Sequence, residues 1–412
     1  MKKAKSSSPI SKHMIHVPEF KYIPPEIWTR ILANLPAKTL LTFRCVCKSW
    51  RSTIDHPNFI SMHLKHSSIN SGNPKLLLAL EGLGCYGEYG GYSLTVRQAN
   101  TLKKTARIFK MEDLFKYYIL GSCNGLLLVR QSGFGFCSEE LRVSNPCIRK
   151  SLRLPKCPLP LSSLIHDAIY VFGYAPVCQD YKVIAIASDH KAQKNIYVAV
   201  YTLRNQQWIV RNNGQSFENS EFRSMFYEIS EYKVISISVF FQGAIYWIGN
   251  APSEGINHEE GPTHLVSFDF DSEKFTYLEL PKPVLKRRSL RFVFILRESL
   301  AIFSISNVSI SIWVVENGAW AQRFKGESSW DGYDVFFDCK LAKCKIFYCE
   351  SDGGCFICGK YSYNIASRQV EEVGKSMSKY LYLETYLDSL VCSKEYGQWL
   401  NSLVGGGFWM FS

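Results

Sequence analysis

Five cysteines lie within twenty residues near the end of the chain, and cysteine thiolates are strong ligands for zinc. Zinc sites commonly use cysteines separated by two residues, and Cys355 and Cys358 have this spacing. The residues between them, Phe356 and Ile357, are typical of a β-strand, on which residues three apart point to opposite faces. No second C-x2-C and no H-x3-H completes a set of four ligands. The sequence therefore favours a structural hairpin over a metal site for Cys339, Cys344, Cys349, Cys355 and Cys358.

Other residues capable of chemistry lack the partners that such chemistry needs. Cys45 and Cys47 are two residues apart on an expected helix and face nearly opposite directions, so Cys47 is expected to pack as a small apolar residue. His166 and Asp167 are adjacent, and no G-x-S-x-G motif accompanies them, which favours a solvated loop over an acid–base pair. The glycines of residues 82–92 do not form G-x-G-x-x-G, and the chain has no Walker motif. We predict no catalytic residue, no metal and no cofactor.

Charge and hydropathy narrow the class of protein further. The 412 residues carry a formal net charge of +12, but only residues 1–5 and 285–291 form basic clusters, and no recognised nucleic-acid-binding module accompanies the charge. For residues 285–291, a solvated charge run is favoured over a site for phosphate or an acidic partner. No run approaches the roughly 18 apolar residues of a membrane span, and no secretory signal follows the basic start. We expect a protein of the cytoplasm or the nucleus, with its fourteen cysteines as thiols and with no nucleic-acid or membrane partner.

Helical spacing organises the chain between Pro24 and Leu64. Pro24 and Pro25 precede an acidic residue, and apolar residues then recur four positions apart until Leu35 and Pro36 end the first helix. A second helix is expected around residues 40–43, a third over 46–54 and a fourth from Pro57. Spacing alone leaves two alternatives open, which are a helical cap packed on the following domain and a separate partner-binding module.

The same stretch resembles an F-box. This family carries Leu-Pro near the start, an Ile-Leu pair, a second Leu-Pro and a Val-Cys-Lys-x-Trp helix. The matching positions are Ile23-Pro24, Ile31-Leu32, Leu35-Pro36 and residues 46–50, and the first pair departs by an isoleucine in place of leucine. The resemblance implies docking on the Skp adaptor of a cullin-type ubiquitin ligase. The adaptor-binding residues that we predict are Ile23, Pro24, Ile27, Ile31, Leu32, Leu35, Pro36, Leu40, Leu41, Val46, Cys47 and Trp50.

Short apolar runs of strand length replace helical spacing from residue 75 onward. Six similar runs start at Lys75, Gly125, Lys182, Gly243, Ser299 and Lys345, so their starts differ by 50, 57, 61, 56 and 46 residues. Five runs are followed by a hairpin-like pair of strands, with turns at Asn145, Asn205, Asp271-Ser272, Asn317 and Ala366-Ser367. Repeats of this length predict a β-propeller of about six blades, with a pair of β-sandwiches as the alternative. Residues 379–391 are expected to close the ring onto the first blade.

Four segments between Gly121 and Gly249 resemble the F-box-associated domain of plant F-box proteins, a kelch-like family. They are GSCNGLLLV, VSNPCIRKSLRLP, FGYAPVCQDYKVIAI and FQGAIYWIG. The predicted fold class is a multidomain α+β chain, in which a small all-α F-box precedes an all-β, kelch-like propeller. The predicted domains are a disordered basic tail (1–21), the F-box (22–66), a linker (67–74), the propeller (75–396) and a second tail (397–412).

The two resemblances together imply a non-catalytic, substrate-recognition subunit of an SCF-type ubiquitin ligase. The F-box would hold the Skp adaptor and, through it, the cullin and RING subunits, while the propeller would hold an unidentified target protein for ubiquitination and degradation. Loops carry specificity on rigid scaffolds, so residues 85–91 and 286–291 are candidates for target binding. We also expect the helices to form a module separate from the propeller. The alternative function is a propeller-fold enzyme, such as a kelch-type oxidase or a glycan hydrolase.

Overall fold

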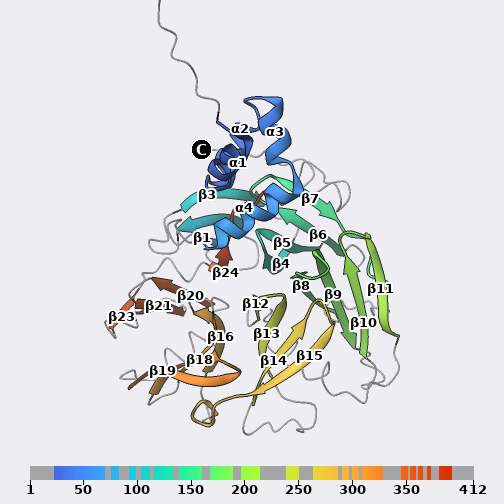
Figure 1. Cartoon of the computed structure of the whole chain (residues 1–412). Helices are drawn as coiled ribbons and strands as arrows, with labels where there is room; N and C mark the ends of the chain where they lie inside the picture. Colours follow the sequence, from blue (N-terminus) through green and yellow to red (C-terminus); the bar gives the residue numbers. More distant parts are fainter. Residues whose placement is uncertain are drawn as a thin grey trace, which may run out of the picture.

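A computed structural model describes the helical region and the strands of the chain (Figure 1). The described residues are 23–69, 76–82, 92–98, 104–111, 116–132, 139–159, 168–188, 196–213, 238–249, 263–285, 290–296, 299–305, 309–327, 345–350, 353–358, 361–364, 369–372 and 380–391. The basic N-terminal segment, the last twenty-one residues, and the loops 85–91 and 286–289 lie outside them.

Four helices form the N-terminal part, as the spacing predicts: α1 (Pro25–Ala33), α2 (Ala37–Phe43), α3 (Lys48–Ile54) and α4 (Pro57–Ile69). Proline occupies the first turn of α1 and of α4, where its missing N–H costs nothing. We refer to residues 25–69 as the helical module.

The prediction that Cys45 and Cys47 lie on a helix is wrong. Helix α2 ends at Phe43, and Cys47 has an extended backbone and caps α3, with its Sγ accepting a hydrogen bond from the N–H of Trp50 at 3.4 Å. Val46 likewise precedes α3 instead of lying within it. Because Cys47 serves as a cap, its side chain stays exposed and is not a packed core residue.

The described strands form six antiparallel sheets of four strands each, and the order along each sheet follows the chain except in the first. The first three sheets contain β24 (Tyr380–Tyr386), β1 (Leu76–Gly82), β2 (Tyr92–Gln98) and β3 (Lys104–Met111); β4 (Lys116–Cys123), β5 (Leu126–Ser132), β6 (Glu139–Asn145) and β7 (Lys150–Arg153); and β8 (Ala168–Ala175), β9 (Asp180–Ser188), β10 (Ile196–Thr202) and β11 (Gln207–Asn213).

The other three sheets continue this pattern. They contain β12 (Val239–Phe241), β13 (Ala244–Gly249), β14 (His264–Asp269) and β15 (Lys274–Glu279); β16 (Leu290–Leu296), β17 (Ser299–Ile305), β18 (Ser309–Glu316) and β19 (Ala319–Glu327); and β20 (Lys345–Glu350), β21 (Gly353–Cys358), β22 (Tyr361–Asn364) and β23 (Gln369–Glu372). A short 3₁₀ turn, η2 (Lys282–Val284), follows the fourth sheet.

The sheets are arranged around a ring, as in a β-propeller (Figure 1). Most neighbouring sheets meet through their first strands, since β24 contacts β4 and β20, β4 contacts β8, and β16 contacts β12 and β20. The third sheet meets the fourth differently, because β8 contacts its second strand, β13. The predicted closing strand is confirmed, because β24 pairs antiparallel with β1 from Leu76 opposite Tyr386 onward. The sheet that contains the start of the propeller is therefore completed by the end of the chain.

The predicted runs and hairpins fall at equivalent places in the sheets, with one exception. Five of the six runs are second strands, whereas the run at Lys345 is the first strand of its sheet. The five predicted hairpins join the third and fourth strands of the second to sixth sheets. In three of them the last turn residue has a left-handed backbone, with φ of 55° at Arg149, Gln206 and Glu273. This shared geometry explains why polar turn residues recur there.

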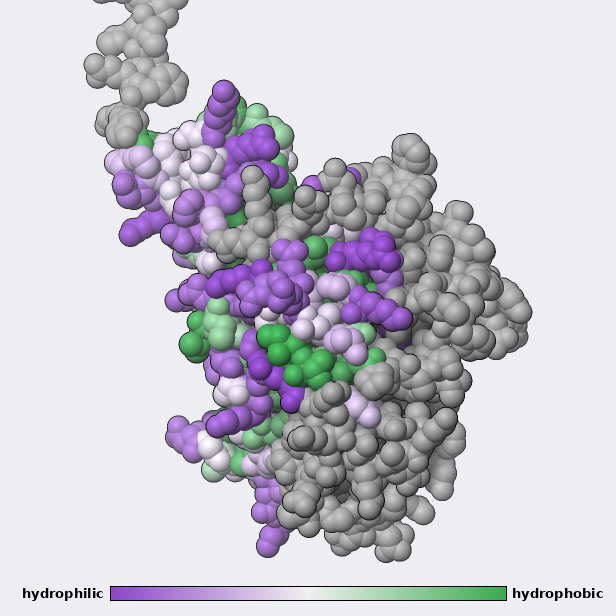
Figure 2. Space-filling view, turned by 90° about the vertical axis from the view of Figure 1, so that its right-hand side faces the viewer, coloured by the Kyte–Doolittle hydropathy of each residue, from purple (hydrophilic) through white to green (hydrophobic). Residues whose placement is uncertain are grey.

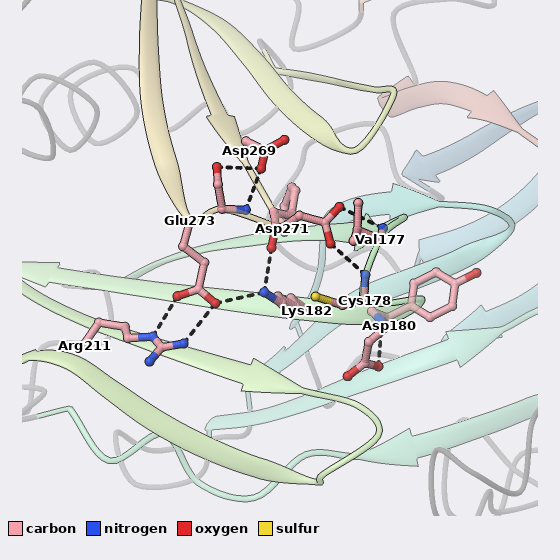
Figure 3. A network of polar contacts seen from close by, with 11 residues as sticks. Val177, Cys178, Asp180, Lys182, Arg211, Asp269, Asp271 and Glu273 are labelled. Atoms are coloured by element: carbon pink, nitrogen blue, oxygen red, sulfur yellow. Dashed lines mark hydrogen bonds and ion pairs between the residues drawn. The ribbon is translucent and has the colours of Figure 1, made fainter.

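A polar network joins the third sheet to the fourth (Figure 3). The buried Lys182 donates from Nζ to the carbonyl oxygen of Phe270 at 2.6 Å and to Oε1 of Glu273 at 2.9 Å. Arg211 donates to both Glu273 oxygens, at 2.7 and 3.1 Å. Asp271 accepts the N–H groups of Val177 and Cys178 from the facing turn. One turn of the fourth sheet, between β14 and β15, is thereby fixed to three segments of the third sheet, which are the turn before β9, β9 itself and β11.

Glu273 supplies the only carboxylate within hydrogen-bond distance of the Lys182 ammonium among the described residues. Burial alone would raise the pKa of Glu273, but the hydrogen bonds from Arg211 and Lys182 outweigh burial and lower it. Glu273→Gln keeps the shape and leaves a buried ammonium without its counter-charge. We expect the free energy of unfolding to fall by about 3 kcal/mol. Chemical denaturation measures this loss, and Glu279→Gln, an exposed change in the same hairpin, is the control. Equal stability of the two variants would contradict it.

The helical module is seated on the ring. Its buried core residues Leu32 and Leu40 share one apolar cluster with Cys147, in the turn after β6, and with Leu390, after β24. Lys38 forms an ion pair with Asp388 at 3.1 Å. The expectation of a separate module is therefore wrong, and the alternative of a cap packed on the following domain holds for this face of the helices.

Candidate functional site

The twelve predicted contact residues divide into three groups by exposure. Leu32 and Leu40 are buried in the core of the module, at 1% and 0% exposure. They support the surface but cannot touch a partner while the module is folded. Leu35, Leu41 and Trp50 are half-buried, and the exposed residues are Ile23, Pro24, Ile27, Ile31, Pro36, Val46 and Cys47.

Three isoleucines of this set follow one another at a spacing of four residues on and just before α1. Ile23, Ile27 and Ile31 are 37%, 49% and 44% exposed, and Val46 reaches 62%. We call these four residues the apolar strip. Half of the eight large apolar side chains that are exposed in the described part of the chain belong to it, although the module is a small part of the chain. Such a concentration is typical of a protein-binding surface.

Aromatic packing holds the helices that carry the strip. The ring of Trp50 lies 5.4 Å from that of Trp28 and 5.2 Å from that of Phe43, so one side chain of α3 joins α1 to α2. Arg44 and Asp55 tie the end of α2 to the end of α3 at 2.6 to 2.8 Å. The strip is therefore presented on a braced surface, which reduces the entropy cost of binding.

The net charge of the helical module favours an acidic partner. The described module holds six lysines and arginines and two acids, which gives 6 − 2 = +4. One of the acids, Asp55, is already paired within the module. Arg30, Lys48 and Arg51 are exposed. A partner with carboxylates around an apolar centre would complement both the strip and these cations.

The module is not apolar all round. In the view of Figure 2 it protrudes from the ring, and the side that it shows is mostly hydrophilic. The side of the ring that carries β11 shows a small hydrophobic island, and Ile209 and Val210 on this strand are 40% and 41% exposed. We assign no partner to this island.

His63 stabilises the module from within and was not singled out by the sequence. It is buried on α4 and donates from Nε2 to the carbonyl oxygen of Leu35 at 2.9 Å, next to the proline that ends α1. Burial lowers the pKa of His63 below 6.5; the hydrogen bond to Leu35 opposes this shift and the nearby His66 adds to it. Burial in the folded module therefore favours the neutral form of His63.

This lowered pKa predicts acid sensitivity of the helices. Near pH 6.5 the unfolded chain takes up a proton at His63 that the folded chain does not, so the stabilisation present above that pH is lost as the pH falls. We expect the wild type to lose more stability than His63→Gln between pH 7.5 and 5.5. Thermal unfolding followed by far-ultraviolet circular dichroism measures both proteins. The same pH dependence in both would show that His63 does not carry the effect.

The other candidates from the sequence give no site in the described part of the chain. The segment of Cys355 and Cys358 is strand β21, as predicted, and Cys349 lies on β20; Cys339 and Cys344 are outside the described residues. His166 and Asp167 are also outside them. Within the described residues, no three His, Cys, Asp or Glu side chains gather as metal ligands would. None of the described helices combines the length and the apolar character that crossing a membrane requires.

Comparison with known families matches both parts of the chain. The model of the F-box domain matches residues 20–62, and that of the F-box associated beta propeller domain matches residues 91–373. An F-box protein of Arabidopsis thaliana is 26% identical over 309 residues, which are 72% of this chain and 66% of the relative. An F-box/kelch-repeat protein of the same plant is 26% identical, over 64% of this chain and 66% of the relative. The matches thus span about two thirds of these relatives.

Among solved structures, an oligogalacturonate lyase in complex with manganese matches 73% of this chain and 78% of its own, at 8% identity and a TM-score of 0.37. A likeness at this level carries no argument about fold or activity.

Proposed function

Because the chain belongs to the F-box proteins that carry an F-box associated beta propeller domain, we propose that it is the substrate-recognition subunit of an SCF-type ubiquitin ligase. The helical module binds a Skp adaptor, which links the chain to the cullin and RING subunits. The propeller binds a target protein, which is then ubiquitinated and degraded. The chain acts in the cytoplasm, the nucleus or both.

The observation that carries this proposal is the exposed apolar strip on a module whose core is already buried against the ring. The ring covers Leu40 and its neighbours, whereas the side chains of the apolar strip stay exposed and can meet another chain. Ile27, Ile31 and Val46 are exposed, and all three lie inside the segment that the F-box model matches. The module also carries exposed cations.

The mechanism is proximity and needs no catalytic residue in this chain. The RING subunit and its conjugating enzyme carry the activated ubiquitin, and this chain holds the target lysine near it. Converting an encounter between two proteins into a reaction within one assembly raises their effective concentration, to millimolar for short flexible links. Fixed packing of the module on the ring raises the effective concentration further, because it limits the orientations that the target can adopt.

The target surface is proposed at the end of the sheets away from the helical module. The module contacts the turn after β6 and the segment after β24, which lie at one end of the sheets. A strand of seven residues is about 20 Å long. The ends of the strands that face away from the helical module are therefore about that far from the adaptor-binding helices. Residues 83–91 and 133–138 are such connections, and they lie outside the described residues.

Proximity labelling in plant cells tests this function. The variant Ile27→Asp/Ile31→Asp is better suited than deletion of residues 1–66, because deletion would also uncover Cys147 and Leu390. The control is Asn58→Asp/Ser61→Asp, which adds the same charge at exposed positions of α4. We expect adaptor, cullin and RING subunits to label with wild type and control and to disappear with the strip variant, while the target remains. Unchanged labelling of all proteins by the strip variant would refute the proposal.

The alternative of a propeller-fold enzyme is tested independently. Elemental analysis of the purified full chain detects a bound metal, and stoichiometric copper or zinc would favour catalysis over the non-catalytic role proposed here.

A further inference from the structure

The five residues after the closing strand, 387–391, touch both sides of the ring closure and the helical module. We propose that this segment couples the two, so that only a completed ring holds the helices in a fixed position. We call residues 387–391 the junction segment. The coupling concerns the chain itself and does not depend on which partner the helices bind.

On the ring side, one amide holds the junction segment to the second sheet. Asn145 is fully buried at the end of β6, and its Nδ2 donates to the carbonyl oxygens of Ser389 at 3.0 Å and Val391 at 2.9 Å. Its Oδ1 accepts the N–H of Cys147 at 2.9 Å, which shapes the turn beneath the helices. A single side chain therefore fixes both the junction segment and that turn.

The junction segment packs so closely on the turn before β5 that no side chain fits between them. Gly125, in the two-residue turn before β5, has a φ of +78°. A Cβ at this position would lie 2.4 Å from the carbonyl oxygen of Leu387 and 2.5 Å from Cβ of Ser389. Only glycine allows this approach, because both the backbone conformation and the contact exclude a side chain. The junction segment is thus held closely against the turn of the neighbouring sheet.

On the module side, the same segment supplies an apolar and a charged contact. Leu390 is buried with Leu40 and Phe59 in the cluster that seats the helices. Asp388 pairs with Lys38 at the start of α2. Val391 belongs to the core cluster of the second and third sheets, against which Ile60 and Leu64 of α4 also pack. The junction segment therefore contacts the helices and the sheets directly.

The consequence is thermodynamic linkage between ring closure and helix docking. If the junction segment stabilises both, loosening either one must weaken the other by the same free energy. A chain whose last strand is missing or unpaired would then carry an F-box in no defined position. The helices would then be held in one position only when β24 has closed the propeller.

Hydrogen–deuterium exchange on the full chain tests the coupling with Asn145→Asp. Aspartate keeps the oxygen that the N–H of Cys147 needs and removes the two donors to the junction segment. Amide exchange should rise about tenfold or more in α1–α4 and in β24 and β1 together, while β9 keeps its protection. The control is Asn205→Asp, the same change in an exposed turn of the third sheet, which should match the wild type.

A second variant covers the case in which Asn145→Asp does not fold. Leu390→Ala removes the apolar contact to the helices and leaves the backbone hydrogen bonds of the segment intact. It should again raise exchange in the helices and in β24, by a smaller factor. A rise confined to the helices, or confined to β24 and β1, would overturn the coupling for either variant.

Discussion

A chain that ends at Gly374 is expected to be aggregated or to unfold far below the melting temperature of the full chain. It lacks β24, which pairs with β1 along the whole strand, and the junction segment after it. The buried side chains of Tyr386, Leu390 and Val391 alone contribute about 1.5 to 3 kcal/mol each. The loss therefore approaches the roughly 5–15 kcal/mol by which domains are stable, and the exposed edge of β1 favours association.

Size-exclusion chromatography and thermal unfolding measure this effect. The matched control is a chain that ends at Cys392, which removes only the tail and keeps β24 and the junction segment. That control should be monomeric and as stable as the full chain. A Gly374 truncation that is also monomeric and equally heat-stable would show that the last strand does not close the ring.

The substitution Ile27→Asp/Ile31→Asp is expected to lower the affinity for a purified Skp adaptor about a thousandfold or more, equivalent to about 4 kcal/mol. The loss has two sources, which are apolar burial that no longer forms and two carboxylates that must be desolvated at the interface. The chain should remain folded, since both isoleucines are nearly half exposed. Calorimetric titration measures the affinity, with Asn58→Asp/Ser61→Asp as the control.

The choice of positions follows from the structure. Aspartate at Leu35 and Leu40, two of the predicted adaptor-binding residues, would place a charge where Leu40 is fully buried. Such a variant would unseat the helices from the ring and could not separate lost contact from lost folding. Unchanged affinity of the Ile27/Ile31 variant, with intact helices, would contradict the assignment of the strip.

Periodicity predicted the elements well because each of them is a local pattern. Apolar residues four apart gave the helices, and Pro36 and Pro57 marked their limits. The repeated apolar runs and turns predicted the four-stranded sheets. The strand pattern after the last repeat predicted the strand that closes the ring. The run at Lys345 shows the limit of this reasoning, since its apolar pattern fits a first strand as well as a second.

The position of the helices on the ring could not be predicted from local sequence patterns. Leu40 meets Cys147 and Leu390, which lie about a hundred and three hundred and fifty residues away, and no periodicity relates them. Which of the predicted adaptor-binding residues are exposed and which are buried depends on this packing of the helices on the ring. Without it, Leu32 and Ile31 looked equally available to a partner.

The network between the third and fourth sheets escaped prediction for a different reason. The pairing of β10 with β11 shifts register between Val198 and Ala199, which leaves Arg211 as the extra residue of a β-bulge. Bulges redirect a side chain, and here Arg211 reaches Glu273 of the next sheet. Strand alternation without the bulge would have placed this arginine differently.

Adaptor binding through the apolar strip is the central claim, and hydrogen–deuterium exchange of the full chain with and without purified Skp adaptor tests it most directly. We predict a one-to-one complex in which amides of α1 and of the connection that contains Val46 gain protection, while β8–β11 exchange as in the free chain. Failure to form a complex, or protection confined to the ring with α1 unchanged, would contradict the account.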